Sequence, residues 1–258
     1  MHTAWVMRFL WFLNLSGAAL VVGRLYFLGL HKTYRFFIAS MVLSLLRSAA
    51  LFPFSPTDPA YYRIWAATQP LIWLSYVLVV LELYRLTLGE YKGIYSLSLW
   101  FFYGGLVVSL TISALTVLPT MSGPPAAFPL RYYYALAQRG FVTSLAFLLL
   151  LLMALVAWFA VPLSRNLLMH CSIYAAYFFT SNVIFLFWHL GPKANNYWSS
   201  VLQLLFAFLC CLSWVFFLTR RGEDRITSLR LKSDPLKERQ LVDQLASLNA
   251  TLLLTAKK

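Results

Sequence analysis

Arg47 and Arg139 each lie inside an apolar stretch of this chain, and no acidic residue lies in the same stretches to neutralise them. Arg47 and Arg139 fall in the halves of their stretches that share one side, and Asp58, in a loop, is the nearest acid. A planar guanidinium group binds carboxylate and phosphate oxygens through paired hydrogen bonds. We therefore expect Arg47 and Arg139 to form a site for a small anion or a lipid headgroup, rimmed by Asp58, Gln69 and tyrosines. The alternative is that both arginines extend to the membrane surface, as Arg does near helix ends.

Arg24 and Glu82 carry opposite charges in two other apolar stretches. Arg24 lies about two helical turns, and Glu82 about one turn, from the stretch ends that share the other side. We expect the two side chains at similar depth, and we interpret them as a buried ion pair that joins two helices or acts as a switch. Arg85 competes with Arg24 as a partner for Glu82.

The remaining residues that could do chemistry do not gather in a catalytic pattern. His31 and His170 would ligate haem only if their rings opposed each other at one depth on neighbouring helices. A metal hydrolase needs clustered His, Asp or Glu ligands, whereas Glu82 is the only acid inside an apolar stretch. We expect no enzyme activity, no cofactor and no metal site.

Seven apolar runs are the elements that position these residues. They cover about 9–30, 36–53, 64–86, 95–118, 136–161, 167–189 and 197–218. A transmembrane helix needs about 20 mostly apolar residues to cross about 30 Å of hydrocarbon. Composition agrees, because 61% of the residues are hydrophobic, 11% are charged and the mean hydropathy is +0.72. The sequence predicts an all-α, polytopic membrane protein whose residues 1–218 form a seven-transmembrane-helix bundle in a lipid bilayer.

The distribution of positive charge predicts the orientation of this bundle. Lys and Arg outside the runs are concentrated after the last run and in the loops on the same side. The positive-inside rule then places the C-terminus in the cytoplasm and the N-terminus outside. The net charge of +13 is a topology signal and an attraction to anionic lipid, so we expect no nucleic acid partner. The first run lacks a convincing cleavage site and is interpreted as a span, and the short loops favour a bacterial cytoplasmic membrane.

Polar residues at helical spacing predict a polar axis inside the bundle. Side chains on the lipid-facing surface should be apolar, so polar stripes are expected to face other helices. The alternative is that these residues only pack helices together, which polar and small residues also do in membranes. The expected axis residues are Asn14, Ser75, His170, Tyr174, Tyr177 and Gln203.

After the last run, the chain changes character. Residues 219–233 form a basic linker, and residues 234–258 are expected to form a cytoplasmic helix begun by Asp234 as N-cap and Pro235 as first residue. Leucines recur along it with the spacing of a coiled-coil seam: Leu241, Leu245, Leu248 and Leu252. Two interpretations compete, a short zipper that pairs with a second copy or a cytoplasmic protein, and an amphipathic helix on the inner leaflet.

Taken together, the sequence favours a receptor-like or scaffolding membrane protein. It would bind an anion or lipid headgroup in the outer half of the bundle and couple to a partner through residues 234–258. The first alternative is a secondary transporter that uses the polar axis, although transport sites usually lie near the midplane at broken helices. An intramembrane enzyme is the second alternative.

Overall fold

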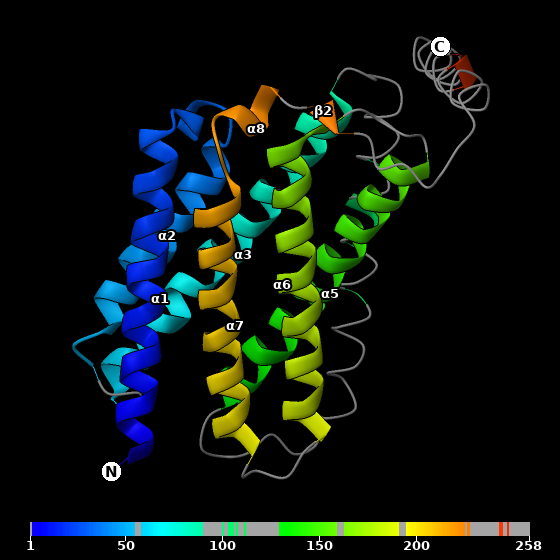
Figure 1. The fold of residues 1–258 in the computed structure, drawn as a ribbon. Coiled ribbons are helices and arrows are strands. Elements are labelled where there is room, and N and C mark those ends of the chain that lie inside the picture. Colours follow the sequence, from blue (N-terminus) through cyan, green and yellow to red (C-terminus); the bar gives the residue numbers. More distant parts are fainter. Residues whose placement is uncertain are drawn as a thin grey trace.

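The computed structural model describes residues 2–54, 58–89, 129–158, 163–190 and 195–224, with short pieces at 100, 103–105, 107, 111, 226–227, 243–244 and 247. The elements are α1 (His2–Phe27), the 3-10 helix η1 (Leu30–Lys32), α2 (Arg35–Leu51), α3 (Pro59–Leu88), α5 (Pro129–Trp158), β1 (Leu163–Ser164), α6 (Arg165–Leu190), α7 (Asn195–Phe217), α8 (Arg221–Asp224) and β2 (Ile226–Thr227). The long helices lie side by side in one bundle (Figure 1).

The long helices in the described part of the chain close into a ring. α1 packs against both α2 and α7, α3 packs against α2 and α5, and α6 packs against α5 and α7. α3 also contacts α6 across the ring. Helices that contact each other around a closed ring can bury polar side chains between them while apolar side chains cover the outside.

Alternate directions of the helices define two ends of this bundle. α3 and α5 run the same way, since the Gln69 amide lies 3.1 Å from that of Gln138 and the Tyr84 hydroxyl lies 2.7 Å from the carbonyl of Leu148. α2 and α6 run the opposite way. We call the end that carries α8 the α8 end, and the other, where α1 begins (Figure 1), the Arg47 end.

Five of the described helices are long and apolar enough to cross a membrane. They are α1, α3, α5, α6 and α7, whereas α2 has only 17 residues. The prediction of an all-helical protein with several membrane helices is therefore confirmed. The expected fourth span, 95–118, lies almost entirely outside the described residues, so the count of seven remains a prediction.

Local signals explain several helix ends that the apolar runs do not mark. Asp58 accepts a hydrogen bond from the backbone of Ala60 at 2.8 Å, and Pro59 occupies the first position of α3. Such a cap starts the helix several residues before its apolar run begins. Ser164 caps α6 in the same manner through the Leu167 amide. The helical backbone of α1 stops before Gly29, whose φ of 73° is left-handed.

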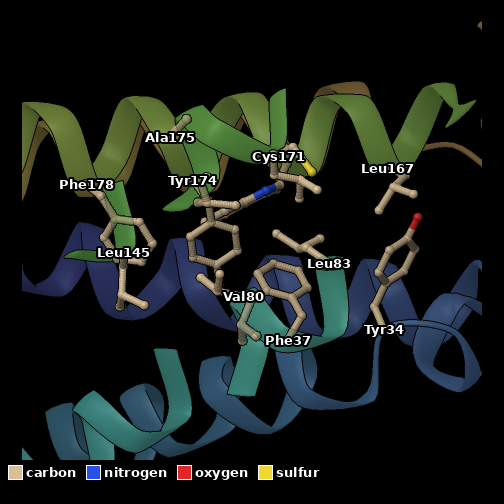
Figure 2. Close-up of a cluster of buried hydrophobic side chains, with 14 of the residues drawn as sticks. Tyr34, Phe37, Val80, Leu83, Leu145, Leu167, Cys171, Tyr174, Ala175 and Phe178 are labelled. Atoms are coloured by element: carbon tan, nitrogen blue, oxygen red, sulfur yellow. The ribbon is translucent and has the colours of Figure 1, made fainter. Parts of the chain in front are cut away.

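The core of the described bundle is made by α2, α3, α5 and α6 together with the ends of α1 and α7. In Figure 2, Phe37 of α2, Val80 and Leu83 of α3 and Tyr174 of α6 point into one cluster. These side chains are almost fully buried. Close packing of this kind fixes the spacing of the helices and therefore the position of their polar residues.

Next to this core, two short strands join the loop before α6 to the chain after α8. β1 and β2 are antiparallel, with Leu163 opposite Thr227 and Ser164 opposite Ile226. The strands lie at the α8 end of the bundle, because β1 immediately precedes α6 and β2 follows α8. The segment after α7 is thus held against the bundle at both α8 and β2.

Candidate functional site

A cavity of about 200 Å³ opens at the Arg47 end between α1, α2 and α3. Four residues of α2 line it from one helix face, because they are spaced three, four and seven apart. The full lining is Trp11 of α1, Ser44, Arg47, Ser48 and Leu51 of α2, and Tyr61, Trp65, Ile72 and Tyr76 of α3. Arg47 is the only charged side chain in that lining.

Arg47 has one polar partner through its side chain in the described structure. Its Nη2 donates to Oε1 of Gln69 at 2.6 Å, and Nε2 of Gln69 donates to Oε1 of Gln138 at 3.1 Å. Gln69 is buried, and this relay links α2 to α3 and α5. Within the described residues Arg47 makes no ion pair, so amides orient its guanidinium group while its charge stays uncompensated.

Aromatic rings form most of the remaining wall. The rings of Trp11 and Tyr61 have centroids 6.5 Å apart and lie nearly edge-on, at 73°. Trp11 also lies 5.8 Å from Phe52 at the end of α2. Rings in this arrangement can pack against an apolar ligand through their edges and faces. Ser44 and Ser48 contribute hydroxyl groups to the same lining as Arg47.

Two residues that were expected in this site have other surroundings. Asp58 caps the start of α3 through Ala60 and is not part of the cavity lining. Arg139 is also absent from the lining, and Thr143, one turn further along the same face of α5, bonds Asn182 of α6 at 2.6 Å. The structure therefore brings Arg47 and Gln69 into direct contact, whereas neither Asp58 nor Arg139 lines the cavity.

The expected ion pair of Arg24 with Glu82 is corrected by the structure, which gives each residue another partner. Both carboxylate oxygens of Glu82 accept backbone hydrogen bonds, from Phe36 and from Phe37, each at 3.0 Å. These amides belong to the first turn of α2, where unsatisfied N–H groups and the helix dipole attract negative charge. Glu82 is thus the cap of a neighbouring helix.

Arg24 performs the complementary task at the end of α7. Its Nε and Nη2 donate to the carbonyl of Leu218 at 3.4 and 3.2 Å. A cation beside the last carbonyl groups of a helix is favourable for the same dipole reason. Arg24 and Glu82 therefore each neutralise a helix end near the α8 end of the bundle.

A second polar cluster, which we call the clasp, holds the chain after α7 against the bundle. It consists of Tyr34, Asn166, Thr219 and Glu223. The Tyr34 hydroxyl donates to both carboxylate oxygens of Glu223 at 3.2 Å, and Nδ2 of Asn166 donates to Oε2 of Glu223 at 2.8 Å. Asn166 also pairs with the backbone of Thr219 in both directions, at 2.7 and 3.2 Å.

Burial and the neighbouring carboxylate both act on the Tyr34 phenol. Burial first, and then the charge of Glu223, raise the pKa of Tyr34 above its usual value. The phenol is therefore protonated over the whole ordinary pH range and serves as a hydrogen-bond donor. The clasp joins the start of α2, the start of α6 and the segment that leads into the C-terminal tail.

The expected axis residues lie between helices. Asn14 donates to the carbonyl of Leu204 at 2.8 Å, Gln203 donates to Ser181 at 2.9 Å, Ser75 lies 3.1 Å from Ser40, and Tyr177 lies 3.3 Å from Tyr76. His170 and Tyr174 are almost fully buried, and the nitrogens of His170 and the hydroxyl of Tyr174 have no partner among the described residues. The hydrogen bonds join α1 to α7, α6 to α7, α2 to α3, and α3 to α6.

Sequence reasoning missed most of the cavity wall. Trp11, Tyr61 and Trp65 lie near span ends, where aromatic residues usually anchor helices at the membrane interface, so their type and position in the sequence do not indicate a binding site. The available signal was the α2 face, on which Ser44, Arg47 and Ser48 are adjacent. The clasp gave no signal at all, since its members are far apart in the sequence.

Several expectations fall outside the described residues. The seam residues of the predicted tail helix, Leu241, Leu245, Leu248 and Leu252, are among them, although Asp243, Gln244 and Ser247 are helical. The described part of the chain holds no group of three or more His, Cys, Asp or Glu residues that could bind a metal ion. No family model matches the chain, and comparisons with curated proteins and with solved structures found no match.

Proposed function

We propose that this protein is a receptor-like or scaffolding membrane protein that binds a small anion at Arg47 and couples to a partner through its C-terminal tail. The observation that carries the proposal is the uncompensated charge of Arg47 in the wall of the cavity. A charge removed from water is costly unless it is paired. An anion that enters the cavity would supply the missing partner.

The proposed bundle has seven spans, with the Arg47 end outside and the α8 end in the cytoplasm. One support is that α3 ends at the α8 end whereas α5, parallel to it, begins at the Arg47 end. Another is that the described positions from 100 to 111 are helical and that Gly105 approaches Leu148 of α5. The orientation itself follows from the distribution of Lys and Arg.

Coupling to the tail would run through α2. Arg47 lies at one end of this helix, and the first turn at the other end is capped by Glu82 and preceded by Tyr34 of the clasp. A shift of α2 on anion binding would change the contact of Tyr34 with Glu223. Residues 234–258 would then be presented to a second copy or to a cytoplasmic protein.

Native mass spectrometry of the purified full chain tests the anion site. Wild type and Arg139→Ala should retain a small anion, and Arg47→Ala should lose it. Retention of the anion by Arg47→Ala, or its loss from Arg139→Ala alone, would contradict the proposal. The same spectra report the number of subunits, and deletion of 234–258 should abolish any dimer that the tail forms.

A secondary transporter is the second candidate, and the buried polar contacts beside the cavity favour it. Tyr76 lines the cavity and contacts the hydroxyl of Tyr177, and Ser75, the residue before Tyr76 in α3, contacts Ser40 of α2. Ion-coupled uptake into proteoliposomes that is lost in Tyr76→Phe would favour transport. Anion binding without uptake would favour the receptor-like function.

A further inference from the structure

We infer that the cavity at Arg47 takes a flat aromatic monocarboxylate of about the size of benzoate. This inference rests on the proposed anion site and adds the class of its ligand. It follows from three properties of the cavity, namely its charge, its volume and the chemistry of its walls.

The charge of the wall limits the charge of the guest. Arg47 contributes one positive charge, and the other lining residues are neutral. Arg63 is exposed and Arg139 is not in the lining, so neither adds to it. A dianion such as phthalate would leave one negative charge unpaired in a confined space, which is unfavourable. A monoanion balances the single positive charge of the cavity lining.

The volume limits the size of the guest. A protein cavity of about 150 Å³ holds benzene. The cavity at Arg47, of about 200 Å³, is larger by roughly a third, which leaves room for about two to three more non-hydrogen atoms than benzene has, and a carboxylate group adds three. A ring that carries one carboxylate group is of that size, whereas drug-sized ligands need larger pockets, from about 300 Å³ upward.

The walls favour a ring over an aliphatic chain. Trp11, Tyr61, Trp65 and Tyr76 surround the space, and Trp11 and Tyr61 already adopt the edge-on packing that aromatic pairs prefer. The carboxylate would lie at Arg47, where Gln69 holds the guanidinium group. The hydroxyl groups of Ser44 and Ser48 lie within the same lining.

Equilibrium dialysis of radiolabelled benzoate against the full chain in nanodiscs of a zwitterionic lipid tests this ligand class. Acetate, benzamide, phthalate and inorganic phosphate serve as competitors, and empty nanodiscs correct for partitioning. Unlabelled benzoate should displace the labelled benzoate best. The other compounds should compete less well, because acetate lacks the ring, benzamide lacks the charge, and phthalate carries a second charge.

Two variants separate the anchor from the walls. Arg47→Gln should lower the affinity for benzoate about ten- to hundredfold, which corresponds to the loss of a charge-assisted hydrogen bond. Substitution of the exposed Arg63, Arg63→Gln, should leave that affinity unchanged. Trp65→Leu should lower the affinity for benzoate about three- to tenfold and leave the affinity for acetate unchanged. The exposed Trp198 of α7 provides the matched control, Trp198→Leu.

Each other outcome overturns a defined part of the account. If acetate and inorganic phosphate bind as tightly as benzoate and need Arg47, the aromatic class is wrong and the anion site stands. If no probe shows binding that depends on Arg47, both proposals fail. Displacement of benzoate by phosphatidylglycerol in the nanodisc would assign the site to a lipid headgroup and overturn the free carboxylate.

Discussion

The two ends of the bundle use ionisable residues in opposite ways. At the α8 end, Glu82 caps the first turn of α2 and Arg24 caps the last turn of α7. At the Arg47 end, Arg47 has an amide partner and faces a cavity. The first arrangement satisfies each charge with the polar backbone of a neighbouring helix, and the second leaves a charge available.

We propose that this difference distinguishes charges that hold the helices together from a charge that binds a ligand. A buried ionisable residue whose hydrogen-bond partners are all protein groups contributes to assembly, and its removal leaves orphaned donors or acceptors. One that lacks a counter-charge and lines a cavity costs stability until a ligand binds. The two ends should therefore respond differently to substitution.

Removal of the Glu82 carboxylate should have the largest effect. Glu82→Ala leaves two amides of α2 without partners and should lower the free energy of unfolding by about 3 kcal/mol. The unfolding midpoint of the detergent-solubilised protein should fall by about 6–12 °C. Arg63→Ala, which removes an exposed charge near the start of the same helix, is the control and should change the midpoint little. Equal effects of the two variants would refute the capping role.

Disruption of the clasp should have a smaller effect. A Cβ atom at position 222 would overlap Oδ1 of Asn166, so Gly222→Ala should displace Asn166 at a cost of about 2 kcal/mol. Trypsin cleavage at Arg220 and Arg221 should then accelerate about thirtyfold, because each 1.4 kcal/mol changes an equilibrium tenfold. Gly23→Ala is the matched control, since a Cβ there meets no atom within 4 Å. Cleavage at the wild-type rate in Gly222→Ala would show that the clasp does not hold the tail.

Loss of one clasp hydroxyl should be milder still and should depend on pH. Tyr34→Phe should cost about 1 kcal/mol at neutral pH, a typical value for a hydrogen bond. The folded-state pKa of Tyr34 is raised, so its contribution is fully present below the unfolded value of about 10 and is lost as the pH rises above it. Unfolding midpoints measured from pH 8 to 11 should show wild type approaching Tyr34→Phe at the alkaline end. A constant difference over that range would mean that the phenol does not titrate with folding.

The coarse fold was predictable from the sequence because lipid imposes a simple rule. Runs of about 20 apolar residues mark membrane helices with little ambiguity. The ends were less predictable, since α3 begins at Pro59 and α5 at Pro129, before their apolar runs. Capping residues and first turns rich in aromatic residues extend these helices beyond the hydrophobic segment. A hydropathy profile does not detect such extensions.

The partners of charged residues were predictable only in part. Arg47 and Gln69 were expected at one site and are hydrogen-bonded. Glu82 and Arg24 were expected to pair because opposite charges at similar depth attract, yet each neutralises a helix end. Every residue has backbone amide and carbonyl groups, so the sequence does not indicate which of them will be the partner of a charged side chain. The helix end that lies near a given charge depends on how all the helices of the ring pack.

The most direct test of the difference between the two ends is the unfolding midpoint of protein depleted of bound anions by dialysis. Arg47→Gln removes an uncompensated charge together with one hydrogen bond, two effects of opposite sign, so its midpoint should stay within about 2 °C of wild type. Addition of sodium acetate or of sodium benzoate should raise the midpoints of wild type and of Glu82→Ala but not that of Arg47→Gln. A midpoint of Arg47→Gln that falls as far as that of Glu82→Ala, or that rises equally with the added anion, would contradict the account.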